Sequence, residues 1–160
     1  MGGALMIILA LVVIAAVMSI AYYNTFVRLR NQSDEAFSTM DVYLKKRYDL
    51  IPNLVETVKH YAIHEKETLE KVISARTMAM GSQSIDERVQ NENMLSGTLK
   101  SLFAVSESYP DLKADTSFLN LQNQLSSIEN EISQARKYYN GAVRALNTKI
   151  EMFPSNIVAN

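Results

Sequence analysis

Two histidines have the type and spacing that could hold a metal ion. His60 and His64 are four residues apart, so on one helix both could face the same ion, with Glu65 as a further ligand. The metalloprotease patterns require a glutamate directly after the first histidine or directly before the second, where Tyr61 and Ile63 stand instead. We therefore predict no metal site and keep a metal-dependent hydrolase only as an alternative interpretation.

No other pattern indicates catalysis or a cofactor. The carboxylates lack the close pairing that shifts a pKa for acid–base work, and Glu67 with Lys71 has the i,i+4 spacing of a surface salt bridge. The chain has no nucleophile elbow, no glycine-rich phosphate loop and no cysteine, which excludes a thiol nucleophile and a zinc–thiolate site. We predict a protein that is not an enzyme and binds no cofactor.

Charge is distributed unevenly along the 160 residues. The 16 Lys and Arg nearly balance the 17 Asp and Glu, and the net charge of −1 excludes nucleic-acid binding through gross positive charge. No charged residue precedes Arg28. An uncharged apolar end is thus joined to a polar remainder of about one domain.

The apolar end has the length of a membrane span. The run from Ala4 to Tyr23 would measure about 30 Å as a helix, and Tyr22 and Tyr23 lie where an interfacial aromatic belt is expected. A cleaved secretory signal is disfavoured because no Lys or Arg precedes the run, which is longer than a typical signal core. We predict a retained single-pass anchor in the lipid bilayer.

Basic residues follow the anchor. Arg28, Arg30 and the run Lys45–Arg47 come after it, so the positive-inside rule favours a cytoplasmic C-terminal domain. On a straight helix the run Lys45–Arg47 would lie about 30 Å beyond Tyr23, several Debye lengths from the lipid surface. We therefore expect these side chains to pair with acidic groups of the same bundle or of another subunit.

Proline and glycine predict where the helices end. Neither occurs between Ala4 and Ile51, so the first helix is predicted to run from the membrane to about Asp49. Pro52 suits the first turn of a second helix, which would end at Gly81 in a positive-φ conformation. A single helix kinked at Pro52 is the alternative.

A third helix is predicted from a capping box. Ser84 would accept a hydrogen bond from the amide of Glu87, and Glu87 would reach back. Gly97 inside this helix indicates a close helix contact, since glycine weakens an isolated helix. Pro110 ends the helix in a predicted loop.

The last predicted helix has the clearest pattern. Asp115 or Thr116 caps its start and Pro154 stops it. Apolar and small side chains recur at alternating spacings of three and four, which is the seam of a coiled-coil-like bundle. The seam residues are Phe118, Leu121, Leu125, Ile128, Ile132, Ala135, Tyr139, Ala142 and Leu146.

Together these elements predict an all-α fold. An N-terminal transmembrane helix would continue into an elongated antiparallel four-helix bundle, because amphipathic helices joined by short loops bury one another's apolar faces most simply in this way. The predicted parts are a short N-terminus, the membrane helix, the bundle and a C-terminal tail. They cover residues 1–3, 4–23, 24–153 and 154–160.

Several short motifs are specific in combination. They are the run Asp49-Leu50-Ile51-Pro52-Asn53-Leu54-Val55, then His64-Glu65 and Ala75-Arg76, and finally Tyr139-Asn140 and Phe153-Pro154-Ser155-Asn156. In these motifs the chain resembles the LemA family of bacterial membrane proteins, although Phe37 stands where that family usually has tryptophan. The resemblance implies a helical bundle on one membrane helix in the bacterial inner membrane, and it implies no established enzyme activity or cofactor.

The motif residues are interpreted as structural. They are Asp49, Pro52, Asn53, His64, Glu65, Arg76, Phe153 and Pro154. We expect Asp49 and Asn53 to satisfy free backbone amides in a turn around Pro52.

The leading hypothesis is a membrane-anchored helical scaffold that self-associates as a homo-oligomer and organises or shapes the membrane. An alternative is an accessory or signalling subunit whose bundle binds another membrane protein. A metal-dependent membrane hydrolase that uses His60, His64 and Glu65 is the third interpretation.

Overall fold

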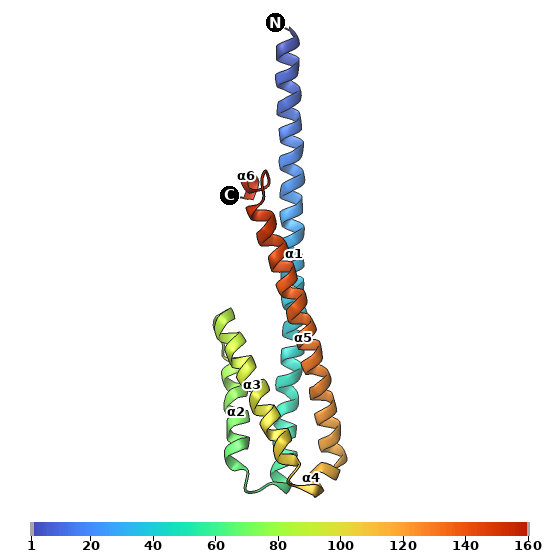
Figure 1. Cartoon of the computed structure of the whole chain (residues 1–160), viewed down its shortest axis with the longest axis vertical. Helices are drawn as coiled ribbons and strands as arrows, with labels where there is room; N and C mark the ends of the chain where they lie inside the picture. Colours follow the sequence, from blue (N-terminus) through green and yellow to red (C-terminus); the bar gives the residue numbers. More distant parts are fainter. Residues whose placement is uncertain (1, 160) are drawn as a thin grey trace. The chain divides into compact units, whose positions relative to one another are not determined.

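The computed structural model describes residues 2–159, and these residues are all-α, as predicted. Six helices and no strand are found within this range (Figure 1). They are α1 (Gly2–Tyr61), α2 (Lys66–Met80), α3 (Ile85–Ser106), α4 (Pro110–Ala114), α5 (Thr116–Glu151) and α6 (Asn156–Ala159).

The first part of α1 carries the apolar run. It is long and apolar enough to cross a membrane, and the rest of the chain buries none of its most apolar window. The hydroxyl of Ser19 donates to the carbonyl of Ala15 at 2.8 Å, so this polar group is satisfied inside the helix. An uncharged helix with every side chain open to its surroundings suits a lipid environment.

The predicted helix break before Pro52 is wrong, and the single-helix alternative is the one observed. Helix α1 continues through Pro52 to Tyr61, and the turn comes at residues 62–65. Proline has no amide hydrogen, so the carbonyl of Tyr48, four residues earlier, has no helical donor. The Nε of Arg76 in α2 donates to this carbonyl at 2.8 Å. A side chain therefore replaces the missing backbone hydrogen bond, and the helix tolerates its proline.

Three other local predictions also differ from the structure. Gly81 leaves α2 with φ of −89°, so no positive φ is needed there. A Cβ added at Gly97 would meet no atom of the described chain within 4 Å, so the expected close helix contact is not made inside the chain. Pro110 begins the short helix α4 instead of a loop, because proline at the first helical position loses no hydrogen bond.

The predicted caps are present. The hydroxyl of Ser84 accepts from the amide of Glu87 at 3.1 Å, while the Glu87 carboxylate accepts from the amide of Gln83, one residue earlier than the capping box requires. The carboxylate of Asp115 accepts from the amide of Phe118 at 2.8 Å and caps α5. Short-range sequence signals thus define the starts of α3 and α5.

The chain forms two compact units. The anchor unit contains the residues up to Met40 and those from Gln134 onward, and the core unit is Asp41–Ser133. In the anchor unit α1 and α5 run side by side in opposite directions (Figure 1). The rings of Phe37 and Tyr139 meet edge to face at 5.7 Å, and Gln32 donates to the hydroxyl of Tyr138.

The core unit contains the last part of α1, all of α2, α3 and α4, and the first part of α5. Helices α2 and α3 form an antiparallel hairpin in it (Figure 1). Each of the four long segments buries an apolar face, and burying each leucine-sized side chain contributes roughly 1.5–3 kcal/mol. Fully buried members of this core are Ile51, Leu54, Val58, Val72, Leu95, Leu102 and Leu125.

We predict that Arg76→Ala destabilises the protein by about 1–3 kcal/mol, because the Tyr48 carbonyl is left without a donor. Pro52→Ala restores a backbone donor, so Arg76→Ala should cost less than ~1 kcal/mol in that background. Urea unfolding of the full chain in mild detergent, followed by circular dichroism, measures both costs. Lys71→Ala, on an exposed side chain of α2, is the control, with an expected change within ~0.5 kcal/mol. Equal costs in the two backgrounds would contradict the coupling.

Candidate functional site

A buried ionic network lies in the core unit, around Arg47 of α1. The Arg47 side chain is 1% exposed and pairs with Glu92 of α3 and Glu129 of α5. Its Nη1 also donates to Oγ of Ser96 at 2.8 Å, and this hydroxyl donates to Glu129 at 3.1 Å. The Tyr48 hydroxyl donates to Glu92. One cation thus links three helices and is shared by two carboxylates.

Burial makes this network expensive to disrupt. Glu92 is 2% exposed, and removing a charge from water costs several kcal/mol, which the pairing with Arg47 must offset. Burial raises the pKa of Tyr48, and the charge of Arg47 opposes this rise only in part. The phenol therefore keeps its proton near neutral pH and remains a donor to Glu92. An arrangement of this kind favours one way of packing α1, α3 and α5 over others.

A second, half-buried ion pair lies beside the network. Asp41 accepts from Arg88 at 3.1 Å and pairs with Lys45 at 2.9 Å. Burial raises the pKa of Asp41, but the hydrogen bonds and charges of Lys45 and Arg88 outweigh it, so this pKa lies below its ordinary value of 3.8. The nitrogen of Lys46 lies over the ring of Tyr43. The basic run Lys45–Arg47 thus finds its partners within the core unit.

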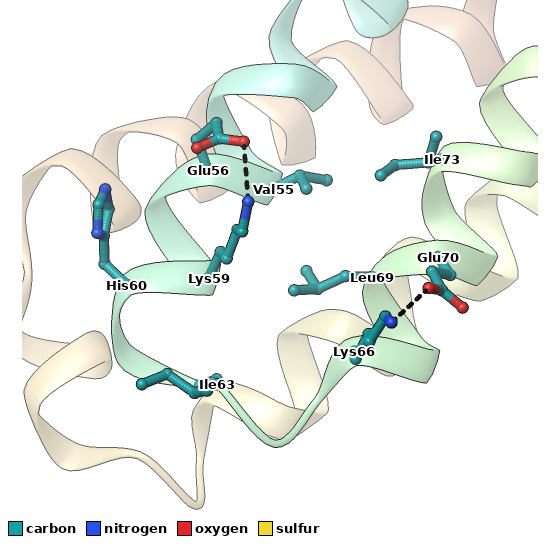
Figure 2. A pocket seen from close by; sticks show the side chains of 10 residues that line it. Val55, Glu56, Lys59, His60, Ile63, Lys66, Leu69, Glu70 and Ile73 are labelled. Atoms are coloured by element: carbon teal, nitrogen blue, oxygen red, sulfur yellow. Dashed lines mark ion pairs between the residues drawn. The ribbon is translucent and has the colours of Figure 1, made fainter.

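An open groove of about 590 Å³ lies between the end of α1 and the start of α2, inside the core unit. Figure 2 shows Val55 pointing into it from α1, with Leu69 and Ile73 facing it from α2. Two ion pairs flank the groove, Glu56–Lys59 at 3.9 Å and Lys66–Glu70 at 3.7 Å. An apolar floor with charges on both sides can accommodate an apolar segment of another chain.

The two histidines do not assemble a site with Glu65. Helix α1 ends at Tyr61, so His60 lies on the helix and His64 lies in the turn, and both are exposed. Glu65 accepts instead from the hydroxyl of Tyr109 at 3.1 Å. Among residues 2–159 no group of three or more His, Cys, Asp and Glu could hold a metal ion.

Two tyrosines form hydrogen bonds that connect the turn after α1 with the segments on either side of α4. Tyr109 donates to Glu65, and the hydroxyl of Tyr61 donates to Asp115 at 3.0 Å. The backbone amide of Phe118, followed by the Tyr61 hydroxyl, lowers the pKa of Asp115. The side chains of Tyr61 and Glu65, which neighbour the two histidines, therefore have hydrogen-bonding roles that connect the end of α1 and its turn to the residues around α4.

The remaining predicted residues are dispersed. Asp49 and Asn53 are exposed within α1 beside Pro52, so their expected role as turn residues is wrong, because the turn comes later. In the anchor unit Tyr22 is half-buried, whereas Tyr23 is exposed. Phe153 is exposed and Pro154 is half-buried, and both follow the end of α5.

The predicted seam residues of α5 all face protein to some extent, and none is exposed. Those in the core unit are buried Phe118, Leu125 and Ile132 and half-buried Leu121 and Ile128. Those in the anchor unit are buried Ala135 and Ala142 and half-buried Tyr139 and Leu146.

Sequence reasoning missed the partners of Arg47. Glu92 occupies the same stripe of α3 as Leu95 and Leu99, at spacings of three and four, and is buried with them. Glu129 follows Leu125 by four residues and precedes Ile132 by three. A charge at an apolar position of a helix is the signal that could have indicated a buried ion pair.

The fold and the exposed apolar span define a helical membrane protein. The LemA family model matches residues 36–160, and the chain belongs to the LemA family.

Named relatives support this assignment. Protein LemA of Metamycoplasma hominis is 28% identical over 138 residues, which cover 85% of this chain and 63% of the relative. Magnetosome proteins MamQ 1 and MamQ 2 of Paramagnetospirillum magneticum are each 23% identical over 183 aligned positions, covering 98% of this chain and 67% of each relative. The chain thus spans about two thirds of the length of these relatives. None of these names states an enzymatic activity.

We predict that Arg47→Met destabilises the protein by about 3–5 kcal/mol, because Glu92 is left buried without its cation. Adding Glu92→Met should recover much of this loss, since two apolar side chains replace the pair. Urea unfolding in mild detergent measures both variants. Lys45→Met, which removes the neighbouring exposed cation, should cost less than ~1 kcal/mol. A double variant no more stable than Arg47→Met would contradict this account.

We predict that the contribution of Asp41 depends on pH. Its folded-state pKa is lowered by Lys45 and Arg88, so its stabilising effect is present above the ordinary value of 3.8 and is lost as the pH falls through the lower folded-state value. Asp41→Asn should therefore reduce stability at pH 7, and its difference from the parent should shrink in stronger acid. Melting temperatures across this range measure the effect, and a difference independent of pH would contradict it.

Proposed function

We propose that this protein is a membrane-anchored helical scaffold whose copies associate with one another, and that it organises or shapes the membrane without catalysis. The observation that carries the proposal is a cluster of exposed apolar side chains on the core unit, at the turn between α2 and α3. We call it the turn cluster. It consists of Met78, Met80, Ile85 and Val89, which are 41%, 53%, 57% and 41% exposed.

The turn cluster leaves apolar area in water that another surface could cover. Several large exposed apolar side chains close together in the chain make this turn a candidate interaction site, whereas single exposed ones are ordinary. Copies anchored through α1 share one orientation in the membrane, so identical surfaces of neighbours can face one another. An interface between two such surfaces can be self-complementary, with its two-fold axis along the membrane normal.

A charge in the turn cluster tests self-association. Ile85→Asp places a carboxylate in the first turn of α3, where the helix itself tolerates an acid. We expect the unaltered protein to form a discrete homo-oligomer in mild detergent and in lipid nanodiscs, measured by size exclusion with light scattering. The variant should dissociate on the order of a hundredfold more readily, because two carboxylates would face each other in an apolar contact.

Gln90→Asp is the matched control, since it adds the same charge at an exposed position of the same helix. It should leave the oligomer intact. A monomeric parent protein in both detergent and lipid would overturn the proposal, as would an Ile85→Asp variant that associates like its parent.

The groove between α1 and α2 favours a second candidate function, that of an accessory subunit. Its apolar floor of Val55, Leu69 and Ile73 could receive an apolar segment of another membrane protein. A monomeric parent protein whose groove variant Ile73→Asp loses a defined membrane partner would favour this candidate over the scaffold.

A further inference from the structure

Residues 152–157, which we call the C-terminal turn of the anchor unit, expose large apolar side chains although hydrogen bonds hold their backbone in place. Phe153 is 79% exposed and Ile157 is 68% exposed, and Met152, the residue after the end of α5, is 50% exposed. Ser155, in the middle, is buried, and its hydroxyl lies 2.7 Å from the Lys149 carbonyl and 2.9 Å from the Met152 carbonyl. Hydrogen bonds of Ser155 therefore hold the turn in one conformation, in which these apolar side chains remain exposed.

The turn lies beside the end of the membrane span. The nitrogen of Lys149 is 5.0 Å from the ring centre of Tyr22, which sets the register of α5 against α1 within the anchor unit. A hollow of about 300 Å³ joins the same elements. It is lined by Tyr23, Phe26, Val27 and Arg30 of α1, by Leu146 and Ile150 of α5, and by Val158 and Ala159 of α6.

Helix direction decides on which side of Tyr22 the exposed side chains lie. Helix α5 runs opposite to α1, so residues after Lys149 lie progressively closer to the span (Figure 1). At about 1.5 Å per residue, Met152 lies roughly 4–5 Å further toward the span than Lys149. Helix α6 lies near α1, because Val158 and Ala159 line the hollow with Tyr23 and Arg30. Phe153 directly follows Met152, so it also lies on the span side of Lys149.

The charges around the turn are mostly positive. The two segments 24–31 and 144–157 together contain four cationic residues and one acidic residue. Arg28, Arg30 and Arg144 are exposed, Lys149 is half-buried, and Glu151 is the acid. Basic side chains beside apolar ones at a bilayer surface suit anionic headgroups.

We propose that the turn of residues 152–157 is a second membrane contact, in which Phe153, Ile157 and Met152 insert into the interface of the leaflet that α1 leaves at Tyr22 and Tyr23. The occupant of this surface is lipid, because the surface is continuous with the span and its charges complement anionic headgroups. The proposal rests on α1 spanning the bilayer and is independent of self-association, so either can fail alone.

The chain contains no cysteine, so single-cysteine variants can be labelled without background. A nitroxide on Phe153→Cys of the full chain, in nanodiscs of phosphatidylcholine and phosphatidylglycerol, reports its depth through collisions with oxygen and a water-soluble nickel complex. Leu11→Cys gives the reference inside the bilayer. Lys137→Cys, at an exposed position of α5 in the same unit and twelve residues before Lys149, gives the reference outside it. We expect Phe153→Cys to show high oxygen and low nickel accessibility, at a depth of about 5–10 Å below the headgroup boundary.

A second variant tests the apolar contact. With the label on Ile157→Cys, adding Phe153→Asp should shift the label toward water, while Asn147→Asp at an exposed position of α5 should not. Nickel accessibility at Phe153→Cys equal to that of Lys137→Cys would overturn the proposal. Protection from both oxygen and nickel, together with spin–spin broadening that vanishes on dilution with unlabelled protein, would also overturn it by assigning the surface to a second copy.

Discussion

Two adjacent residues of α1 provide polar links to three other helices of the core unit. Arg47 pairs with Glu92 of α3 and Glu129 of α5, and the carbonyl of Tyr48 accepts from Arg76 of α2. A buried guanidinium without carboxylates would be very costly, and a buried carbonyl without a donor would also destabilise the fold, by a smaller amount. These helices must therefore meet α1 at one level. Apolar packing alone would permit α2, α3 and α5 to shift along α1, whereas these directional hydrogen bonds and ion pairs fix their positions.

The proline in α1 belongs to the same arrangement. Because Pro52 removes the donor of Tyr48, it makes that carbonyl available to α2. The residue that looks like a helix terminator thus becomes the reason why α2 is held against an uninterrupted α1. Tyr48, the residue directly before the family motif around Pro52, is joined to the separate match at Arg76 by one hydrogen bond of 2.8 Å. No turn separates the membrane span from these residues.

The surfaces left open have different chemistry. The groove between α1 and α2 is apolar with ion pairs beside it, and the turn cluster on α2 and α3 is apolar with the charged residues Asp86, Glu87 and Arg88 in the same stretch. The C-terminal turn of the anchor unit combines exposed Phe153 and Ile157 with neighbouring cations. Apolar area with acids and bases suits a protein partner, and apolar area with cations suits an anionic lipid surface. The proposed protein contacts and the proposed lipid contact thus involve separate surfaces of this chain.

The amino-acid sequence by itself determined the all-α class, the uncharged span, the caps at Ser84 and Asp115 and the apolar stripe of α5. These features depend on composition, on helical periodicity and on hydrogen bonds between residues three apart, all of which are local. Tertiary structure decided whether α1 would stop at Pro52, because the compensating donor lies 28 positions away from Tyr48 in the chain. It also decided that Arg47 is buried instead of facing solvent, since its carboxylate partners come from α3 and α5, and only packing brings such distant charges together.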